Sequence, residues 1–167
     1  MIEVKLKDLG ELSDRFNLQM PKGMFLCTRD KERDNVMTIG WGFIGVMWGK
    51  PVLNVVVRPT RYTHELLSNS DVFIVGVPKA DEMKEALQIC GTVSGRDRDK
   101  FELARLKKGE GRSVNAPVVE GCETQYECKI LYRQAMDPTF LNKEIDKRHY
   151  PKKDYHVFYI GEIIDCY

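Results

Sequence analysis

Residues 37–57 are the most apolar part of the chain, and their interruptions limit what the chain can form. The segment is MTIGWGFIGVMWGKPVLNVVV, with four glycines ahead of the Lys50-Pro51 step. A membrane-spanning helix needs about 20 consecutive apolar residues without such breaks. We therefore predict two β-strands joined by a glycine-rich connection, with residues 51–57 as a buried strand rich in β-branched side chains.

Short apolar runs separated by polar turns continue along the chain, which is typical of a mostly β protein. Further strands are predicted over residues 23–28, 36–41, 71–78, 125–136 and 155–167. Short helices are expected after Thr63 and over residues 81–90 and 99–106, with a loop over 107–117 and a charged excursion with a helical turn over 138–154. This order favours an antiparallel barrel with helical insertions, folded as a single domain over residues 1–167.

The balance of charges excludes partners that need a strong overall field. The chain has 26 Lys+Arg and 25 Asp+Glu residues, a net charge of +1. We therefore expect no nucleic-acid or membrane partner, and any anion site must be local. The N-terminal sequence shows no apolar signal segment, and the five cysteines form no CxxC pair. A cytoplasmic protein with reduced thiols is expected.

The sequence VVVRPTRYTHELL contains the first candidate anion site. Because Pro59 has no N–H for a central strand, the chain must turn after Arg58. Arg61 follows, and Thr63 is expected to cap the next helix at its N-terminus. Backbone N–H groups at a helix start and arginine side chains both favour an anion. Alternatively, both arginines are solvated or pair with carboxylates such as Glu65.

A second basic turn, SGRDRDKFE, follows later in the chain. Ser94 and Gly95 allow a tight turn whose N–H groups can form an anion-binding nest, and Arg96 adds a cation. Asp99 stands in capping-box spacing, which places Lys100 in the first turn of a helix. A cation there opposes the helix dipole by about 0.3–1 kcal/mol, which is explained if Lys100 points at a bound anion. The alternative is a solvated loop in which Arg and Asp neutralise one another.

The strand sequence NVMTIGWG is a candidate edge for binding a flat ring. Its alternation places Val36 and Thr38 on one face, and Asn35 and Met37 on the other. Backbone amides beside polar side chains could bind a polar ring edge, and the glycines allow a close approach. A glycine-kinked core strand is the alternative.

The histidines and cysteines give weaker signals. His64 and His149 are expected to be exposed, and a lone residue such as His156 is more often a hydrogen-bonded core residue than a catalytic one. Cys27 and Cys90 are expected to be small buried apolar residues. No cluster has the spacing of metal ligands, so no metal site is predicted.

Taken in order, six segments of the chain resemble the flavin reductase-like family, and in particular its flavoredoxin branch. They are NVMTIGWG, RPTRYTHELL, FIVGVP, CGTVSGRDRDKFE, YECKI and DYHVFYIGEI. The resemblance covers residues 35–163. It implies an FMN-binding split β-barrel, usually a homodimer with the flavin near the subunit interface. It also implies that the anion is the FMN phosphate.

The resemblance assigns roles to the candidate residues. Those around the phosphate and the ribityl chain would be Arg61, Thr63, Ser94, Gly95, Arg96 and Lys100, while Arg58 either reaches the phosphate or braces the turn. Those lining the isoalloxazine ring would be Asn35, Val36, Met37 and Thr38. Beside the ring or the ribityl chain would lie Trp41 and Tyr62, with Cys90 and Gly91 close to the cofactor. His156 would lie near the flavin or a nicotinamide, as the candidate catalytic residue.

Two functions are compatible with the resemblance. The first is an NAD(P)H-dependent flavin reductase that passes reducing equivalents through bound FMN to an acceptor. The alternative is a flavoredoxin-type electron-transfer protein that a partner redox protein reduces. Since no GxGxxG fingerprint is present, NADH or NADPH as co-substrate would bind without a Rossmann unit. A barrel that binds pyridoxal phosphate or haem is a third alternative.

Overall fold

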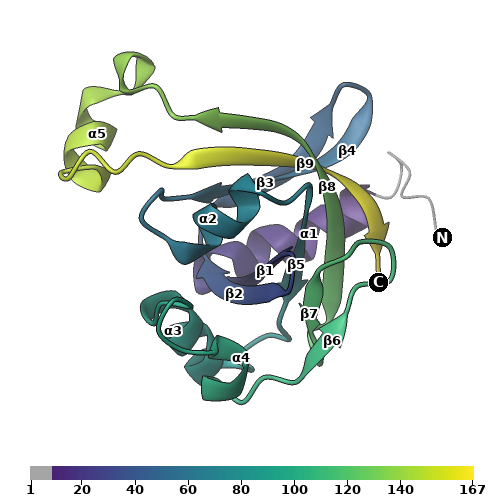
Figure 1. The fold of residues 1–167 in the computed structure, drawn as a ribbon. Helices are drawn as coiled ribbons and strands as arrows, with labels where there is room; N and C mark the ends of the chain where they lie inside the picture. Colours follow the sequence, from purple (N-terminus) through teal and green to yellow (C-terminus); the bar gives the residue numbers. More distant parts are fainter. Residues whose placement is uncertain (1–8) are drawn as a thin grey trace.

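Seven antiparallel strands form the sheet on which the rest of the chain is built (Figure 1). The computed structural model of the protein describes residues 9–167. The strands lie in the order β2-β1-β5-β8-β9-β4-β3. Their bounds are β1 Met24–Asp30, β2 Arg33–Ile39, β3 Gly42–Met47, β4 Lys50–Val57, β5 Val72–Val77, β8 Thr124–Ala135 and β9 Val157–Cys166. A separate two-stranded sheet pairs β6 (Lys108–Glu110) with β7 (Pro117–Val119).

The two edge strands of the large sheet, β2 and β3, are neighbours in the sequence, and this curls the sheet into a barrel. Only Gly40 and Trp41 join them. The three Cα–Cα steps from Ile39 to Gly42 span at most about 11 Å, whereas six strand spacings in a flat sheet would separate its edges by about 29 Å. The edges must therefore approach each other at Trp41. No ladder joins β2 to β3 within residues 9–167, so the barrel is split, and the predicted fold class is confirmed.

Helices are inserted between the strands. The α-helices are α1 Leu9–Gln19, α2 Tyr62–Ser68, α3 Lys84–Thr92, α4 Lys100–Leu103 and α5 Lys143–His149, and the 3-10 turns are η2 Met20–Lys22 and η3 Pro138–Phe140. Across residues 9–167, none of the helices combines the length and the apolar content that crossing a bilayer requires.

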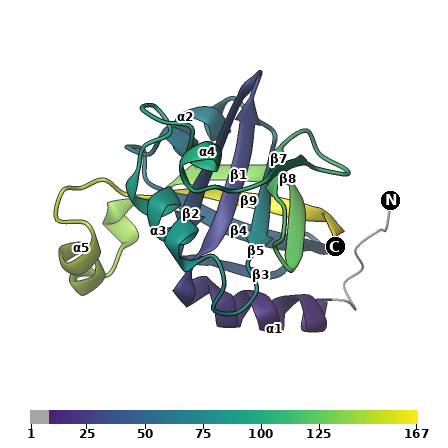
Figure 2. The same cartoon turned by 90° about the horizontal axis from the view of Figure 1, so that it is seen from below.

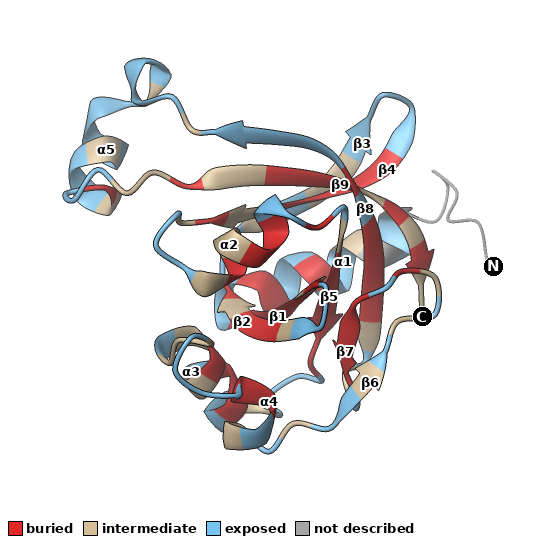
Figure 3. Cartoon of the chain, in the orientation of Figure 1, coloured by how far each residue is buried: buried red, intermediate tan, exposed pale blue. Residues whose placement is uncertain are grey.

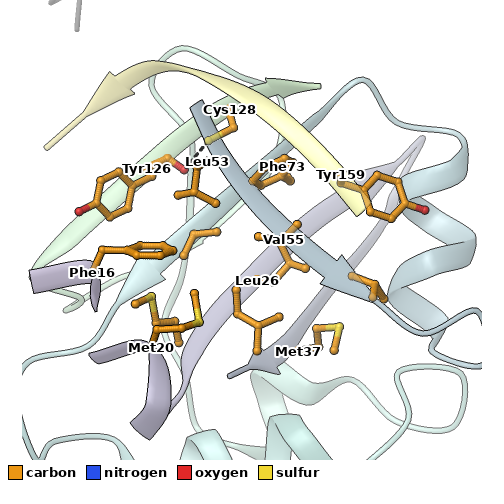
Figure 4. Packing of buried hydrophobic residues seen from close by; sticks show 14 of the residues in the cluster. Phe16, Met20, Leu26, Met37, Leu53, Val55, Phe73, Tyr126, Cys128 and Tyr159 are labelled. Carbon is orange, nitrogen blue, oxygen red and sulfur yellow. Dashed lines mark hydrogen bonds between the residues drawn. The ribbon is translucent and has the colours of Figure 1, made fainter. Parts of the chain in front are cut away.

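The inside of the curled sheet holds the main hydrophobic core (Figure 4). Leu26 and Leu53 project into it from strands, and Phe16 of α1 packs edge-to-face on Tyr126 with 5.9 Å between ring centroids. Figure 2 shows α1 lying along one side of the barrel. The sequence pattern did not predict this helix, because apolar and polar residues are mixed around it: Leu18 is 76% exposed while Gln19 is buried.

A second hydrophobic cluster lies on the other face of β1, β2 and β5, where α3, α4 and β7 cover the sheet. Phe25, Val36, Leu87 and Phe101 are among its buried members. Because β1 and β5 face both clusters, they are buried along nearly their whole length (Figure 3). Cys27 and Cys90 lie in this second cluster, which confirms that they are small buried apolar residues.

The β8–β9 hairpin extends beyond the barrel and carries α5 at its far end (Figure 1). We call its connecting segment, residues 136–156, the arm. Asn142 starts α5, and its Oδ1 accepts hydrogen bonds from the backbone N–H groups of Glu144 and Ile145 at 2.9 and 3.3 Å. The helical turn predicted in the charged excursion is therefore confirmed.

The prediction that residues 42–49 form a connection without a strand is wrong, because strand β3 lies within them. β3 pairs with β4 from Gly42↔Val55 to Met47↔Lys50 through a two-residue turn. That turn needs positive φ at both positions, and Trp48 and Gly49 have φ of +54° and +69°. Tryptophan is an unusual residue at positive φ, so this hairpin lacks the usual sequence signal of a two-residue turn.

The loop predicted over residues 107–117 is also wrong, because it contains β6 and the start of β7. The buried carboxylate of Glu127 organises the bend between them. It accepts hydrogen bonds from the backbone N–H groups of Arg112, Ser113 and Val114 at 2.6 to 2.8 Å, and from the hydroxyl of Tyr167 at 2.7 Å.

The predicted helices are present with different ends. Thr63 does not cap α2 as predicted: the N-cap lies two residues earlier, at Arg61, which makes no side-chain capping bond. α3 starts later than predicted because Asp81 and Met83 have φ of +62° and +59°. α4 has four residues, and Arg105, with φ of +53°, turns the chain away soon after it.

Candidate functional site

Two adjoining cavities lie beside β2, the end of β4 and the start of α2. The Lys100 cavity, of about 360 Å³, is lined by Asn35, Met37, Arg58, Thr60, Arg61, Tyr62, Thr63, Thr92, Val93, Ser94, Gly95, Lys100 and Asp154. The Trp41 cavity, of about 230 Å³, is lined by Met37, Thr38, Ile39, Gly40, Trp41, Val56, Arg58, Arg61 and His156. Met37, Arg58 and Arg61 line both, so the two cavities share a wall.

Lys100 is a buried cation in the first turn of α4. The side chain of Asp99 caps this helix by accepting from the backbone N–H groups of Phe101 and Glu102 at 2.9 and 3.3 Å, as predicted. Lys100 is only 5% exposed, and its Nζ donates to the Cys90 carbonyl at 3.0 Å. Burial lowers the pKa of Lys100 to about 8. Within residues 9–167 its one hydrogen-bond partner is that carbonyl, and no carboxylate pairs with its charge.

Arg61 faces the same cavity and bonds to the same helix end as Lys100. Its Nη1 donates to the Gly91 carbonyl at 3.0 Å, next to the Cys90 carbonyl that Lys100 binds. These carbonyls belong to the last turn of α3, where a helix leaves carbonyl groups without intrahelical partners. Both cations keep further N–H donors for a ligand, since ammonium has three and guanidinium five.

Asn35, Thr63 and Gly95 pack together on another wall of the Lys100 cavity. Asn35 Nδ2 donates to Thr63 Oγ1 at 2.8 Å, and both residues are buried. A Cβ at Gly95 would lie 2.2 Å from Asn35 Oδ1 and 2.7 Å from Tyr62 Cδ1. Only glycine fits this position without displacing its neighbours.

Arg58 connects the barrel to the arm. Its Nη1 lies 2.8 Å from Asp154 Oδ1, and its Nη2 donates to the His149 carbonyl at 2.9 Å. Its Cζ lies 5.0 Å from the centroid of the Tyr150 ring, a cation–π distance. Arg58 therefore ties the end of β4 to the arm, while it also lines both cavities.

The Trp41 cavity is bounded by aromatic rings from the barrel and from the arm. The centroid of the Trp41 ring lies 5.1 Å from those of both His149 and His156. His156 immediately precedes β9, and its Nδ1 lies 2.8 Å from Tyr150 Oη. Burial, reinforced by the charge of Arg58, lowers the pKa of His156 to about 4. The ring is therefore both hydrogen-bonded in the interior and part of a cavity wall.

Comparison with known proteins identifies the family. Residues 17–167 match the model of the flavin reductase like domain. The chain belongs to the flavin reductase-like family. The resemblance drawn from the sequence segments is thereby confirmed.

Proteins of solved structure and a protein matched by sequence are similar to this chain. The crystal structure of a flavoredoxin from Methanosarcina acetivorans is 26% identical with a TM-score of 0.69, and the match covers 87% of this chain and 67% of that chain. The NADH:FAD oxidoreductase SgcE6 of Streptomyces globisporus shares the fold at 21% identity and a TM-score of 0.67, over 100% of this chain and 86% of that chain. An uncharacterized protein of Archaeoglobus fulgidus is 27% identical over 155 residues, which is 93% of this chain and 77% of that protein.

Some predicted residues of this flavin reductase-like protein lie outside the cavity linings. The side chains of Val36 and Cys90 are buried in the second hydrophobic cluster, and Gly91 contributes its carbonyl to Arg61. Arg96 is exposed: its guanidinium bonds to the Thr60 carbonyl at 3.3 Å, pairs with Glu65 at 3.5 Å and covers the Tyr62 ring. The pairing with Glu65 that the sequence offered as an alternative for Arg58 and Arg61 is made instead by Arg96 and by Arg33.

Other residues reach the cavities without having been predicted. Thr60, Thr92 and Val93 line the Lys100 cavity, and each lies inside a motif that was singled out, so extending the motifs would have included them. Asp154 also lines it, but no local signal indicates this, because it depends on how the arm packs back on the barrel.

The exposure predicted for two histidines is wrong. His64 is half-buried, with its Nδ1 2.7 Å from Tyr159 Oη, and desolvation lowers its pKa. His149 is half-buried against Trp41. Over residues 9–167, no group of His, Cys, Asp and Glu side chains is arranged to hold a metal ion.

Proposed function

We propose that the protein binds flavin mononucleotide and acts as an NAD(P)H-dependent flavin reductase that passes reducing equivalents through the bound flavin to an acceptor. The observation that carries this proposal is the Lys100 cavity, where a buried lysine and Arg61 lie beside the Trp41 cavity in a chain of this family. Similarity to the flavoredoxin of Methanosarcina acetivorans supports a flavin as the ligand.

The donor set of the Lys100 cavity fits a phosphate. Its lining contains three cations, Arg58, Arg61 and Lys100, but one carboxylate, Asp154, which pairs with Arg58. The surplus of positive charge favours an anion, and the hydroxyl groups of neighbouring threonines and Ser94 add neutral donors. Arg61 and Lys100 would hold the phosphate because their bonds to the end of α3 already fix their positions.

The Trp41 cavity would hold part of the isoalloxazine ring. Its lining of Met37, Thr38 and Gly40 combines backbone groups with an apolar and a hydroxyl side chain. Thr38 Oγ1 donates to the Leu87 carbonyl at 2.6 Å, which fixes its side chain. When bound, the flavin supplies the hydride and single-electron chemistry. The protein's residues would bind the ring, orient it and limit its contact with water.

The second candidate function is electron transfer without direct reduction by a nicotinamide. The similarity to a flavoredoxin favours it, whereas similarity in fold to an NADH:FAD oxidoreductase favours the reductase. The visible spectrum of the purified protein comes first, because flavin bands distinguish both functions from a barrel that binds pyridoxal phosphate or haem. Anaerobic mixing of the FMN-loaded protein with NADH and with NADPH then separates them. Bleaching within catalytic times supports the reductase, and persistent oxidised flavin with both nucleotides contradicts it.

We also propose a homodimer, which would cover an exposed apolar face of the sheet. Trp48 and Tyr132 are 54% and 43% exposed, and their ring centroids lie 6.3 Å apart. Further exposed apolar side chains on β3 and β8 are Phe43, Val46, Met47 and Leu131. Exposed aromatic side chains that lie together, such as the Trp48–Tyr132 pair, mark a candidate contact site. Sedimentation should give a dimer, and Trp48→Lys should shift it toward monomer.

A cytoplasmic location is part of the same proposal. All five cysteines are free thiols, which suits a reducing compartment. Burial raises the pKa of Cys90 to about 11 and that of Cys122 to about 12, so these thiols remain protonated and unreactive at neutral pH.

A further inference from the structure

Tyr150 and His156 form a buried pair beside the Trp41 cavity. Tyr150 Oη lies 2.8 Å from His156 Nδ1. The two residues are 2% and 8% exposed, so water does not readily complete their hydrogen bonds. Among residues 9–167, neither the phenol nor the imidazole has a second hydrogen-bond partner.

The two possible positions of the imidazole hydrogen differ in which hydrogen of the pair they leave without an acceptor in the described part of the protein. A neutral phenol carries one O–H, and a neutral imidazole carries one N–H, at either Nδ1 or Nε2. If His156 carried its hydrogen on Nδ1, it would donate to Tyr150 and leave the buried phenolic hydrogen without an acceptor, which folded proteins avoid. If Nε2 carries the hydrogen, Tyr150 donates to Nδ1, and the hydrogen left over is the Nε2–H of His156. His156 lines the Trp41 cavity, where a ligand can accept that hydrogen, whereas Tyr150 lines neither cavity.

Both groups are neutral at pH 7, so this choice applies under ordinary conditions. Burial, with the nearby charge of Arg58, lowers the pKa of His156 to about 4. Burial raises the pKa of Tyr150, although Arg58 opposes that shift. The imidazole therefore has a single hydrogen and the phenol keeps its own.

The position of Tyr150 does not depend on its hydroxyl alone. Its ring lies 5.0 Å from the Tyr155 ring, between centroids, and Arg58 Cζ lies 5.0 Å above it. His156 in turn lines the Trp41 cavity. Because Nδ1 is engaged on the side of the arm, Nε2 is the ring nitrogen that remains for a molecule in the cavity.

We propose that Tyr150 is a positioning residue that fixes His156 as the Nε2–H tautomer, so that His156 offers a neutral hydrogen-bond donor to an amide carbonyl oxygen in the Trp41 cavity. The identity of that oxygen rests on the proposed function: it belongs to the carboxamide of a nicotinamide or to the flavin ring. Such a donor orients the ligand and transfers no proton.

The tautomer is tested directly by the ¹⁵N NMR shifts of the imidazole nitrogens in the FMN-loaded protein at pH 7. The Tyr150→Phe variant keeps the ring and removes only the hydroxyl. Tyr155→Phe is the matched control, because its hydroxyl bonds to Asp146 at 2.7 Å on the same arm and makes no bond to His156. We expect the Nε2–H pattern in the wild type and in Tyr155→Phe, and a mixture of tautomers in Tyr150→Phe. An Nδ1–H pattern in the wild type, or unchanged shifts in Tyr150→Phe, overturns the proposal.

Binding measurements distinguish the two sources of the oxygen. If it belongs to the nicotinamide, Tyr150→Phe raises KM for NADH or NADPH by about 3- to 10-fold, the range for one neutral hydrogen bond, with kcat within twofold. If it belongs to the flavin, the same variant weakens FMN affinity by a similar factor. Unchanged KM and FMN affinity overturn the ligand-donor role. A wild-type protein that no nicotinamide reduces contradicts the reductase function, while the NMR result still decides the role of Tyr150.

Discussion

The guanidinium of Arg58 and the carboxylate of Asp154, 2.8 Å apart, tie the end of β4 to the arm that carries His156. Both side chains are about three-quarters buried, with 25% and 24% exposure, so solvent screens this pair less than a surface ion pair. The two arginines of the RPTRYT corner therefore differ in role: Arg58 holds the arm, and Arg61 faces the Lys100 cavity at the end of α3.

Replacing Arg58 with alanine is expected to loosen the arm while the barrel stays folded. The variant loses the ion pair with Asp154 and the bond to the His149 carbonyl, which together should lower the free energy of unfolding by about 1–3 kcal/mol. Amide hydrogen exchange should accelerate within residues 136–156 and remain slow in the barrel strands. The control is Lys50→Ala, which removes an ion pair between β4 and β9 at the other end of β4. Equal exchange in the arm of both variants would contradict the bracing role.

Lys100→Ala is expected to weaken FMN binding. Loss of a shielded, charge-assisted hydrogen bond to phosphate corresponds to about 10- to 150-fold in affinity, measured by fluorescence titration of the apoprotein. Arg61→Ala should act in the same direction. Arg96→Ala is the control, because Arg96 is exposed and already bonds to Glu65 and the Thr60 carbonyl, and we expect less than about a threefold change for a surface charge. Unchanged affinity in both Lys100→Ala and Arg61→Ala would exclude this phosphate site.

The burial of Lys100 also predicts how the stability of the apoprotein depends on pH. Its pKa is lowered from 10.5 to about 8 in the folded state. Between these values the unfolded chain binds more protons at this residue, so the contribution of Lys100 to the free energy of unfolding rises as the pH increases from 8 toward 10.5. Without flavin, Lys100→Met should therefore have a higher Tm than wild type at pH 7 and a smaller advantage at pH 10. An advantage that grows with pH would show that Lys100 is not destabilised by burial.

Glu127→Gln tests the bend between β6 and β7. The carboxylate accepts three backbone N–H bonds and one hydroxyl bond while fully buried. An amide has one acceptor oxygen, and its NH₂ group would face N–H donors, so we expect a loss of about 2–3 kcal/mol of unfolding free energy. Glu120→Gln, which alters an exposed carboxylate of the same hairpin, should change stability by less than about 1 kcal/mol. Urea unfolding of the two variants makes the comparison.

The parts of the site that the sequence predicted are those encoded by short contiguous motifs. Lys100 and Asp99 lie at a helix start whose capping residues are adjacent in sequence, and Arg61 follows a proline that must end a strand. Local chemistry is enough to place such residues near an anion. The contacts of Tyr150 and Asp154 were not predictable, because they depend on an arm that returns to the barrel from residues far along the chain.

The same distinction applies to the fold. Strands with continuous β-branched or apolar runs, such as β4 and β5, were predicted, since their pattern reflects burial on both faces. β3 was missed because none of its residues is buried and its turn places Trp48 at positive φ. The closing of the barrel depends on the order of the strands in the sheet, which no local sequence pattern specifies. Once that order is known, the short Gly40-Trp41 link forces the two edge strands together.

Gly95→Ala tests whether the Ser94-Gly95 turn is a wall of the phosphate site. A methyl group at Gly95 must displace Asn35, whose Oδ1 would be 2.2 Å away, and thereby disturb the bond from Asn35 to Thr63. We expect the free energy of unfolding to fall by about 1–3 kcal/mol and FMN affinity to fall by up to about tenfold. Gly45→Ala is the control, since nothing lies within 4 Å of a Cβ there, and it should leave FMN affinity unchanged. Wild-type FMN affinity in a folded Gly95→Ala protein would place the phosphate away from this turn.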